Sequence, residues 1–566
     1  MACLVAKIVH GHRYWQIVTS QRVDGRPRQV VLAHLGTADR LLARLAEGLG
    51  QPIKARVREF GFLAAAWQLA ADLGIAEIID RHVPKRDQGP SVGKYLLLAA
   101  LNRLARPTSK SKFAAWYAQT ALRRWMPVRR SALASQRFWD HMDAVTEDAI
   151  RKIEADLSKR IVERFNIDLR CLCFDCTNFD TFVDSRNPAK LPQRGHAKSK
   201  RTDLRVVGLA LLVSTDFRIP LFSHVYPGNQ PDSVTFGSVT ETLVARYRAL
   251  TREVDHVTLV LDKGNNSAEN LDQIAQSPFH VVGSLVPSQH SELLAVPAAK
   301  FVRQTDPRLG GVSAYRMTKE VYGHTWTIIV TRSKTLLDGQ LRGIAQHLAK
   351  RRRALADLAR RLERSQRPGA KGKGFTRESL AKQVERLTSG QYIRQILIVT
   401  VRERRGKLSL RFSTNRKALN DLQRRVLGKR ILFTDNHDWP TDEIILAYRS
   451  QHHVEAAFRQ MKDSGSISWC PVLHWTDQKI RVHTFYCVLA LTLMNLIFRE
   501  AWRAGVRATP NRVAEELRGI REVVNVYPSG SDGKGGRPRA VVTYTEESPL
   551  ACQLAKLFRL RELRSR

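Results

Sequence analysis

The sequence predicts a multidomain α/β protein, with a mixed-sheet core that is interrupted by a β-rich insertion and preceded by β-hairpin and helical regions. The chain has 566 residues, several times the usual domain length of about 150. Hydrophobic residues make up 43% of it, which supports a large core and excludes disordered, collagen-like and coiled-coil compositions. Between residues 169 and 287, strand-like and helix-like segments alternate as in a mixed sheet covered by helices.

The chain is also strongly basic. It contains 93 lysines and arginines against 53 aspartates and glutamates, which gives a formal net charge of +40. Such an excess attracts polyanions, and nucleic acid is the first candidate partner.

The seven cysteines are few and unevenly spaced for this length. They predict no disulfide framework and favour a reducing cytoplasm. The first residues show no long apolar stretch behind a charged end, so we expect no signal peptide. Residues 482–498 are nearly all apolar, but His483, Thr484 and Asn495 interrupt them, which favours a buried helix over a membrane span.

The first 165 residues predict two regions. Residues 1–57 alternate around Asp24-Gly25, which indicates a small β unit with a hairpin. Residues 58–165 have a helical pattern, and Ser91 and Thr146 are positioned to cap two of the helices.

Basic and aromatic residues are interleaved inside this helical region. Residues 103–139 hold nine basic residues and no acid, with four tryptophan and tyrosine residues between them. A solvated face over an aromatic core is one interpretation, but in so basic a chain we favour a surface for the DNA backbone. The candidate contacts are Arg123, Arg124, Arg129 and Arg130.

Four further regions follow. Residues 166–289 predict the first part of the sheet core, and residues 290–430 an insertion with β hairpins on both sides of a basic helix. Within it, residues 341–390 hold fourteen basic and four acidic residues, either a solvated helical hairpin or a second nucleic-acid surface. Residues 431–509 return to the core with a long helix capped by Thr441, and residues 510–566 are a basic tail with little pattern.

Two carboxylates stand at matching places in the predicted core. Asp175 ends the strand-like run CLCFD, and Asp262 ends the run VTLVLD. Because strand ends in α/β sheets border the crevice where ligands bind, we expect the two carboxylates to share a site.

The helix predicted over residues 441–463 carries the third acid. Its spacing places four polar residues on one face: Tyr448, Gln451, Glu455 and Lys462. Carboxylates from two strands and one helix suit hard divalent cations, and two such ions serve phosphoryl transfer. We therefore expect Asp175, Asp262 and Glu455 to bind two Mg²⁺ or Mn²⁺ ions, the arrangement that serves phosphodiester chemistry.

The sequence around these acids resembles the DDE transposases of bacterial insertion sequences, in particular their Y-R-E-K branch, the insertion-sequence-four superfamily. The matching runs are CFDCTNFDTF, VTLVLDKGNNSAEN and YRSQHHVEAAFRQMK, supported by RGHAKSKRTDLRVVGLALLV and the opening hairpin. The resemblance implies an RNase H-like catalytic core in which Asp175, Asp262 and Glu455 are the catalytic metal ligands.

The resemblance also implies DNA contacts. Tyr448 and Lys462 match the Y and K that touch DNA phosphate beside the cleaved bond. Gln451 stands where the family has arginine, and it keeps a donor but loses the charge and the bidentate fork. A basic loop ahead of a core strand is either a solvated turn or a further phosphate contact; it contains Lys198, Lys200 and Arg201.

The function implied is cut-and-paste DNA transposition: metal-dependent cleavage at the ends of an insertion sequence, then strand transfer into target DNA. The expected partners are double-stranded DNA and a second copy of the chain, in a synaptic complex on the nucleoid of a bacterial cytoplasm. A metal-dependent nuclease of the same fold and a non-catalytic DNA-binding protein derived from a transposase are the alternatives.

Overall fold

The computed structural model describes residues 2–23, 26–47, 51–85, 89–250, 257–265, 267–369, 374–470, 472, 474–527 and 538–564. The chain divides into two compact units. Unit 1 comprises Met1–Leu69, Thr108–Ser135 and Glu500–Arg566, and unit 2 comprises Ala70–Pro107 and Gln136–Arg499. The start of the chain, part of the basic helical region and the C-terminal residues therefore fold together.

Unit 1 contains two three-stranded antiparallel sheets, in the orders β1-β2-β3 and β17-β16-β4. The strands are β1 (Ala2–Val9), β2 (His12–Val23), β3 (Arg26–Gly36), β4 (Lys54–Glu59), β16 (Arg521–Tyr527) and β17 (Arg539–Tyr544). Because β16 lies between β4 and β17, the residues after 510 form part of this fold and not the unpatterned tail that we predicted.

The predicted hairpin is the pair β2–β3, and its turn Asp24-Gly25 lies outside the described residues. A second hairpin, β1–β2, turns at His10-Gly11 with φ of 50° and 81°. Two-residue hairpin turns of this kind need positive φ, which glycine adopts freely.

Short helices complete unit 1. They are α1 (Ala38–Glu47), the start of α2 (Gly61–Asp72), α5 (Phe113–Ala118), α6 (Leu122–Trp125), α19 (Pro510–Gly519), α20 (Pro549–Leu557) and α21 (Leu560–Arg564). A Cβ at Gly61 would lie 2.2 Å from the carbonyl oxygen of Leu517, so the contact between α2 and α19 requires glycine.

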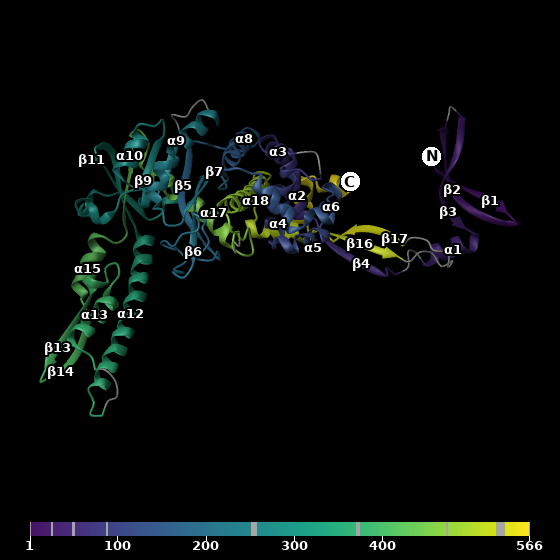
Figure 1. The fold of residues 1–566 in the computed structure, drawn as a ribbon. Helices are drawn as coiled ribbons and strands as arrows, with labels where there is room; N and C mark the ends of the chain where they lie inside the picture. Colours follow the sequence, from purple (N-terminus) through teal and green to yellow (C-terminus); the bar gives the residue numbers. More distant parts are fainter. Residues whose placement is uncertain are drawn as a thin grey trace. The chain divides into compact units, whose positions relative to one another are not determined.

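A nine-stranded mixed sheet forms the centre of unit 2, in the order β10-β11-β12-β15-β9-β8-β5-β6-β7 (Figure 1). The strands are β5 (Cys171–Thr181), β6 (Arg205–Ser214), β7 (Pro220–Pro227), β8 (Thr258–Leu261), β9 (His280–Ser284), β10 (Val302–Arg303), β11 (Val312–Val321), β12 (His324–Ser333) and β15 (Lys429–Thr434). Strand β8 runs parallel to β5 and β9, and the other neighbouring pairs are antiparallel.

Helices cover both faces of this sheet. On one face, Phe174 of β5 packs against Phe236 of α9, with ring centroids 5.0 Å apart. The helices outside the acidic site are α3 (Ile75–His82), α4 (Val92–Ala105), α7 (Ser135–Asp143), α8 (Glu147–Phe165), α9 (Asp232–Leu250), α10 (Ala268–Ala275) and α11 (Ser291–Leu294). The predicted caps are confirmed, since Ser91 and Thr146 accept the backbone N–H groups of Lys94 and Ala149.

The apolar helix predicted near residue 482 is α18 (Asp477–Arg503). Within the described part of the chain it is the one single helix long and apolar enough to cross a membrane, and 94% of its most apolar stretch is buried inside the protein. The bent pair α2 and α3 passes the same test only when joined across a 53° bend.

Between β12 and β15 the chain leaves the sheet and forms a separate arm, residues 334–428 (Figure 1). The arm consists of α12 (Lys334–Ser365), α13 (Arg377–Thr388), α14 (Ile393–Ile396), β13 (Leu397–Arg404), β14 (Lys407–Thr414) and α15 (Arg416–Arg425). Both predicted hairpins are confirmed, as β11–β12 and β13–β14. The first belongs to the main sheet, however, so the inserted part begins only at α12.

Candidate active site

The two aspartates come together through strand register. Asp175 lies within β5 and not at its end as predicted, because β5 pairs with β6 as far as Thr181. Strands β5 and β8 are parallel, and their last paired residues are Phe174 and Leu261. The next residue on each strand is an aspartate, so Asp175 and Asp262 stand at the same level of neighbouring strands.

Helix α17 (His452–Lys462) lies over the face of β5 from which Asp175 projects. Alternate residues of a strand share a face, so Cys173, Asp175 and Thr177 point the same way. The Sγ of Cys173 donates to the carbonyl oxygen of Ser450 at 3.2 Å, just ahead of the helix. At the other end, the Nζ of Lys462 donates to the Oγ1 of Thr177 at 2.8 Å. The two contacts hold α17 across the position of Asp175.

The long helix that we predicted over residues 441–463 is broken. It forms α16 (Thr441–Arg449) and α17, separated by Ser450 and Gln451. The break follows from the packing of this segment on β5. The hydroxyl of Ser450 donates to the carbonyl oxygen of Ala447, and the carbonyl oxygen of Ser450 accepts a hydrogen bond from the Sγ of Cys173. The predicted cap is also wrong: the residue before α16 is Pro440, and no side chain caps this helix.

The break changes how the four signature residues lie. Tyr448 and Gln451 are buried, with 6% and 9% of their surface exposed. Glu455 and Lys462 are exposed residues of α17. Tyr448 belongs to α16, Gln451 to the break, and Glu455 and Lys462 to α17, so the four are not on one continuous helix as predicted.

Charge is concentrated around Asp175. Burial raises the pKa of its carboxyl group to about 6, and the neighbouring carboxylates of Asp262 and Asp232 act in the same direction. The ammonium group of Lys198 opposes them. Burial likewise raises the pKa of the Tyr448 phenol, with smaller contributions from the charges of Asp262 and Glu455. Tyr448 thus lies within the field of both acids.

The basic residues predicted near the site are not equivalent. The Nζ of Lys198 donates to the carbonyl oxygen of Cys176 at 2.5 Å, directly beside Asp175. Lys200 is exposed and adopts a positive φ of 64°. Arg201 is exposed and forms two hydrogen bonds with Asp203, so an internal acid already neutralises it. Burial and the nearby Lys198 lower the pKa of the Lys462 ammonium group.

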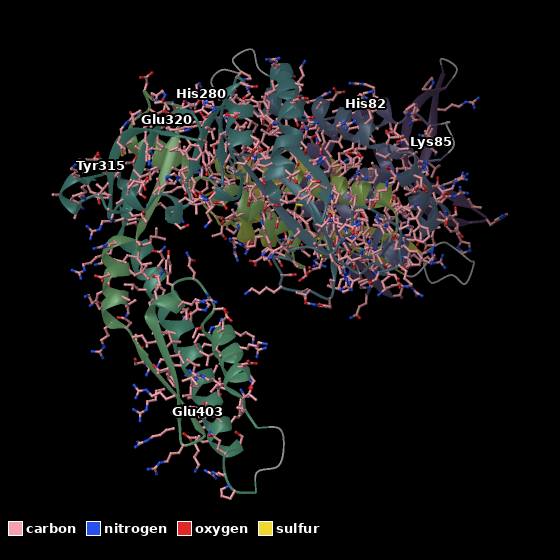
Figure 2. All side chains as sticks on the ribbon, turned by 60° about the vertical axis from the view of Figure 1, so that its left-hand side comes forward. His82, Lys85, His280, Tyr315, Glu320 and Glu403 are labelled. Atoms are coloured by element: carbon pink, nitrogen blue, oxygen red, sulfur yellow. The ribbon has the colours of Figure 1, made fainter. Side chains whose placement is uncertain are left out.

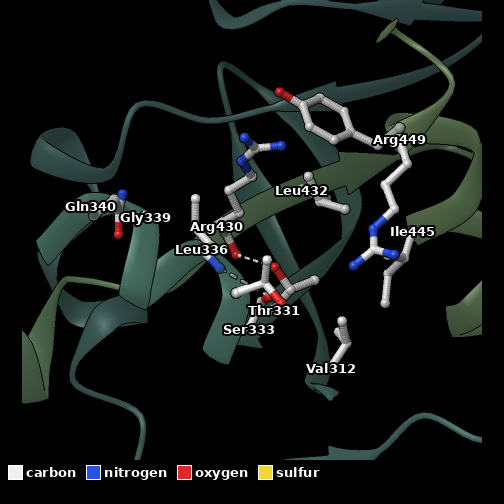
Figure 3. Close-up of a pocket in the computed structure, with 12 residues that line it drawn as sticks. Val312, Thr331, Ser333, Leu336, Gly339, Gln340, Arg430, Leu432, Ile445 and Arg449 are labelled. Carbon is white, nitrogen blue, oxygen red and sulfur yellow. Dashed lines mark hydrogen bonds between the residues drawn. The ribbon is translucent and has the colours of Figure 1, made fainter. Parts of the chain in front are cut away.

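A cavity of about 490 Å³, which the sequence did not predict, opens beside Tyr448 (Figure 3). Its wall combines apolar side chains, including Leu432 and Ile445, with Arg430 and Arg449. The guanidinium carbon of Arg430 lies 5.5 Å from the centre of the Tyr448 ring, within cation–π distance. The only signal in the sequence was a basic residue at the start of the apolar run RILFT.

The four arginines predicted as a DNA surface lie in unit 1. Arg123, Arg129 and Arg130 are exposed and line a groove of about 760 Å³. Arg124 differs from this expectation: it forms a 2.7 Å ion pair with the fully buried carboxylate of Glu522. Because Arg124 neutralises an acid of its own unit, its role is structural.

The donor set around Asp175 is chemically suited to a divalent cation. Mg²⁺ and Mn²⁺ prefer carboxylate oxygens, and a cation would offset the burial and the neighbouring carboxylates that together raise the pKa of Asp175. Among the described residues, no three histidine, cysteine or acidic side chains are already grouped as a metal site. Two of the three predicted ligands, Asp175 and Asp262, are adjacent by register, and the third, Glu455, is an exposed residue of α17.

Comparisons with known proteins agree with this picture in part. Residues 6–59 match the model described as "IS1634 family transposase, N-terminal domain", which supports an insertion-sequence transposase. No curated protein matches the chain. A solved piggyBac transposase synaptic complex with hairpin DNA is similar over 82% of both chains, with 8% identity and a TM-score of 0.38. At that score the likeness carries no argument about function.

Proposed function

We propose that this protein is a DDE transposase that catalyses cut-and-paste DNA transposition. The observation that carries the proposal is the register of β5 and β8, which sets Asp175 beside Asp262 beneath the helix that carries Glu455. Structural acids are normally paired with a cation or kept at the surface. Here a half-buried carboxylate stands next to another at a cost in stability, which is typical of a functional site.

We infer that strands β7, β6, β5, β8 and β9 form an RNase H-like core. They are consecutive in the sheet, mix antiparallel and parallel pairs, and carry both aspartates on adjacent inner strands. Strands β10–β12 and β15 then extend the sheet beyond β9.

The chain's own residues would orient the substrate. Mg²⁺ or Mn²⁺ held by Asp175, Asp262 and Glu455 would supply charge stabilisation for phosphoryl transfer. The ammonium group of Lys462, fixed by Thr177, is two residues along β5 from Asp175 and is placed to donate to an oxygen of the scissile phosphate. Tyr448 would position the same phosphate, and the Lys198 ammonium group would balance the excess negative charge.

Two displacements would follow, the first at a phosphate at the end of the element and the second at a phosphate of the target strand. In the first, the oxygen of water bonds to phosphorus, the 3′ oxygen leaves with a proton, and the end of the element is freed. In the second, the oxygen of that 3′-hydroxyl loses its proton and bonds to a phosphorus of the target strand, and the 3′ oxygen of the target leaves and takes up a proton. The exposed arginines Arg123, Arg129 and Arg130 would hold the terminal repeats, and two copies of the chain would join two ends on bacterial nucleoid DNA.

The test is a cleavage and joining assay with purified protein and a plasmid that carries the two ends of the element. We expect cleavage that needs Mg²⁺ or Mn²⁺, followed by integration of the released fragment. Asp175→Asn, Asp262→Asn and Glu455→Gln should each lower cleavage at least 1,000-fold, on the order expected when a central catalytic group is lost, and leave DNA affinity within about threefold.

Asp148→Asn is a matched control, because Asp148 is an exposed acid of α8 whose ion pairs, within the described residues, are with its helical neighbours Arg151 and Lys152. It should cleave like the wild-type chain. Cleavage without joining would identify a nuclease, and DNA binding without metal-dependent cleavage would identify a non-catalytic DNA-binding protein; either result would refute the proposal.

A further inference from the structure

The hairpin β13–β14 has two chemically different faces. Its inner face is apolar: Val399, Val401, Leu408, Leu410 and Phe412 pack against the helices of the arm. Figure 1 shows the two strands along one side of the arm and α12 and α13 along the other. The hairpin is therefore held rigidly by one face, and the opposite face points to solvent.

We call this opposite face the ribbon face. Strand periodicity and pairing place eight residues on it. They are Ile398, Thr400, Arg402 and Arg404 from β13, and Lys407, Ser409, Arg411 and Ser413 from β14. Four of the eight are cations, three are small hydroxyl residues and none is an acid. Glu403 of the same hairpin falls on the other side of the pleat.

The cations of the ribbon face are not neutralised within the protein. Across the part of the chain that the structure describes, no ion pair involves Arg402, Arg404, Lys407 or Arg411. Surface charges of soluble proteins usually mix signs, so a run of one sign needs an explanation outside the fold. Figure 2 shows nitrogen-tipped side chains projecting along the arm around Glu403.

At the tip of the hairpin, the cross-strand pairing of the cations lowers the stability of the fold. Arg404 stands directly opposite Lys407, and like charges at opposed positions destabilise a sheet. Arg405 adds a third cation in the turn and adopts a positive φ of 51°, a conformation that asparagine or glycine adopts more easily. A hairpin selected only for folding would place neutral or opposite charges here.

We propose that the ribbon face binds double-stranded DNA by lying in its major groove. A two-stranded ribbon fits that groove, whose walls are lines of phosphate. Arginines and lysine at the edges would meet phosphates, and the small Thr400 and Ser409 between them let the ribbon approach the base edges. The inference rests on the proposed function for its DNA partner, and it assigns a second DNA-binding element that is separate from the acidic site.

The experiment compares two full-length variants that lose equal charge. The ribbon variant carries Arg402→Gln, Arg404→Gln, Lys407→Gln and Arg411→Gln. The matched control carries Arg416→Gln, Lys417→Gln, Arg424→Gln and Arg425→Gln, four exposed positions of α15 in the same arm. Binding to a 60-base-pair DNA duplex is measured by fluorescence anisotropy from 50 to 300 mM NaCl, after melting curves have shown that both variants fold.

The ribbon variant should lose at least tenfold in affinity, and its log–log salt slope should fall by roughly 0.9 for each phosphate contact removed. The control should stay within about threefold. A ribbon variant that binds like the wild type, or a control that loses as much, would overturn the proposal.

A 60-base-pair RNA duplex separates groove binding from general attraction to polyanions. The major groove of A-form RNA is too narrow for side chains to read. The ribbon substitutions should therefore affect RNA binding much less than DNA binding, and an equal loss on RNA would refute the groove assignment. These results are independent of catalysis: DNA binding through the ribbon without cleavage would defeat only the proposed function, and cleavage with an inert ribbon would defeat only this inference.

Discussion

The acidic site on β5 and the ribbon face of the arm carry charge in opposite ways. Asp175 is half-buried next to Asp262, and the raised pKa of its carboxyl group means that its negative charge opposes folding. The ribbon face is exposed, and the other side of its hairpin packs on the small core of the arm. Its charges are therefore hydrated and lower the stability of the fold only slightly. The buried charge is positioned by three elements and the exposed charge by one hairpin. Substitutions at the two places should therefore differ in kind.

The largest difference between the two regions is expected in the free energy of unfolding when a positive charge is introduced. Gln451 is buried at the junction of α16 and α17, so Gln451→Arg would bury an unpaired cation and cost about 3–5 kcal/mol of unfolding free energy. Ser413→Arg on the exposed ribbon face should change it by less than about 0.5 kcal/mol. Urea denaturation of both variants measures the difference. A stable Gln451→Arg would show that the junction opens toward solvent or DNA phosphate.

Removing the charge of Asp175 should raise the free energy of unfolding, whereas introducing a charge at Gln451 should lower it. Its pKa is about 6 in the folded protein against an ordinary 3.8, so the folded state binds the proton more tightly and the wild type loses stability as pH rises from about 4 to about 6. Asp175→Asn should then be more stable by up to about 3 kcal/mol above pH 6 and equal to the wild type near pH 4. Denaturation at pH 4 and pH 8 tests this. A gain that is the same at both pH values would contradict the electrostatic explanation.

Lys462 should affect catalysis more than folding. Its ammonium group contacts Thr177, two residues along β5 from Asp175, so Lys462→Ala should reduce cleavage about 100- to 1,000-fold, the usual range for one lost donor at a reacting group. Thr177→Val removes the positioning contact and keeps the ammonium group, and it should have a smaller effect. Single-turnover cleavage rates separate the two. If Thr177→Val lost as much as Lys462→Ala, the lysine would act mainly by holding α17 on β5.

The smallest effects are expected on the exposed arginines of unit 1. Arg123→Gln, Arg129→Gln and Arg130→Gln should each lower the salt slope of DNA binding by roughly 0.9 if the side chain meets a phosphate. Arg124→Gln should leave the slope unchanged and lower the melting temperature, because the buried carboxylate of Glu522 then keeps only one of its two arginine partners, Arg58, among the described residues. A slope that falls only for Arg124→Gln would reverse this assignment.

Local signals in the sequence predicted much of the fold. The caps Ser91 and Thr146 and the hairpins at β11–β12 and β13–β14 follow from side-chain chemistry and alternation, which depend on near neighbours. The extension of β5 to Thr181 depends on its distant partner β6, and β16 is placed by β4 and β17. Long-range pairing of this kind leaves little trace in a local pattern.

The same limit applies to the site. The residue types and order of Asp175, Asp262 and Glu455 are visible in the sequence, but the break between α16 and α17 is not. No proline or glycine marks it, and its cause is the contact of Ser450 with Cys173, 277 positions earlier. Arg430 was missed for a similar reason, since only the folded chain brings it to the Tyr448 ring. Which charges are already satisfied, as for Arg124 and Arg201, is likewise a property of the fold.

The central claim is that Asp175, Asp262 and Glu455 act as one metal site, and titration of the full-length chain with Mn²⁺, followed by electron paramagnetic resonance, tests it most directly. We expect saturable binding by the wild type, and at least tenfold weaker binding by Asp175→Asn, Asp262→Asn and Glu455→Gln, because each change removes a ligand charge. Asp148→Asn should bind like the wild type. Equal Mn²⁺ affinity in the wild type and all three site variants would contradict the account.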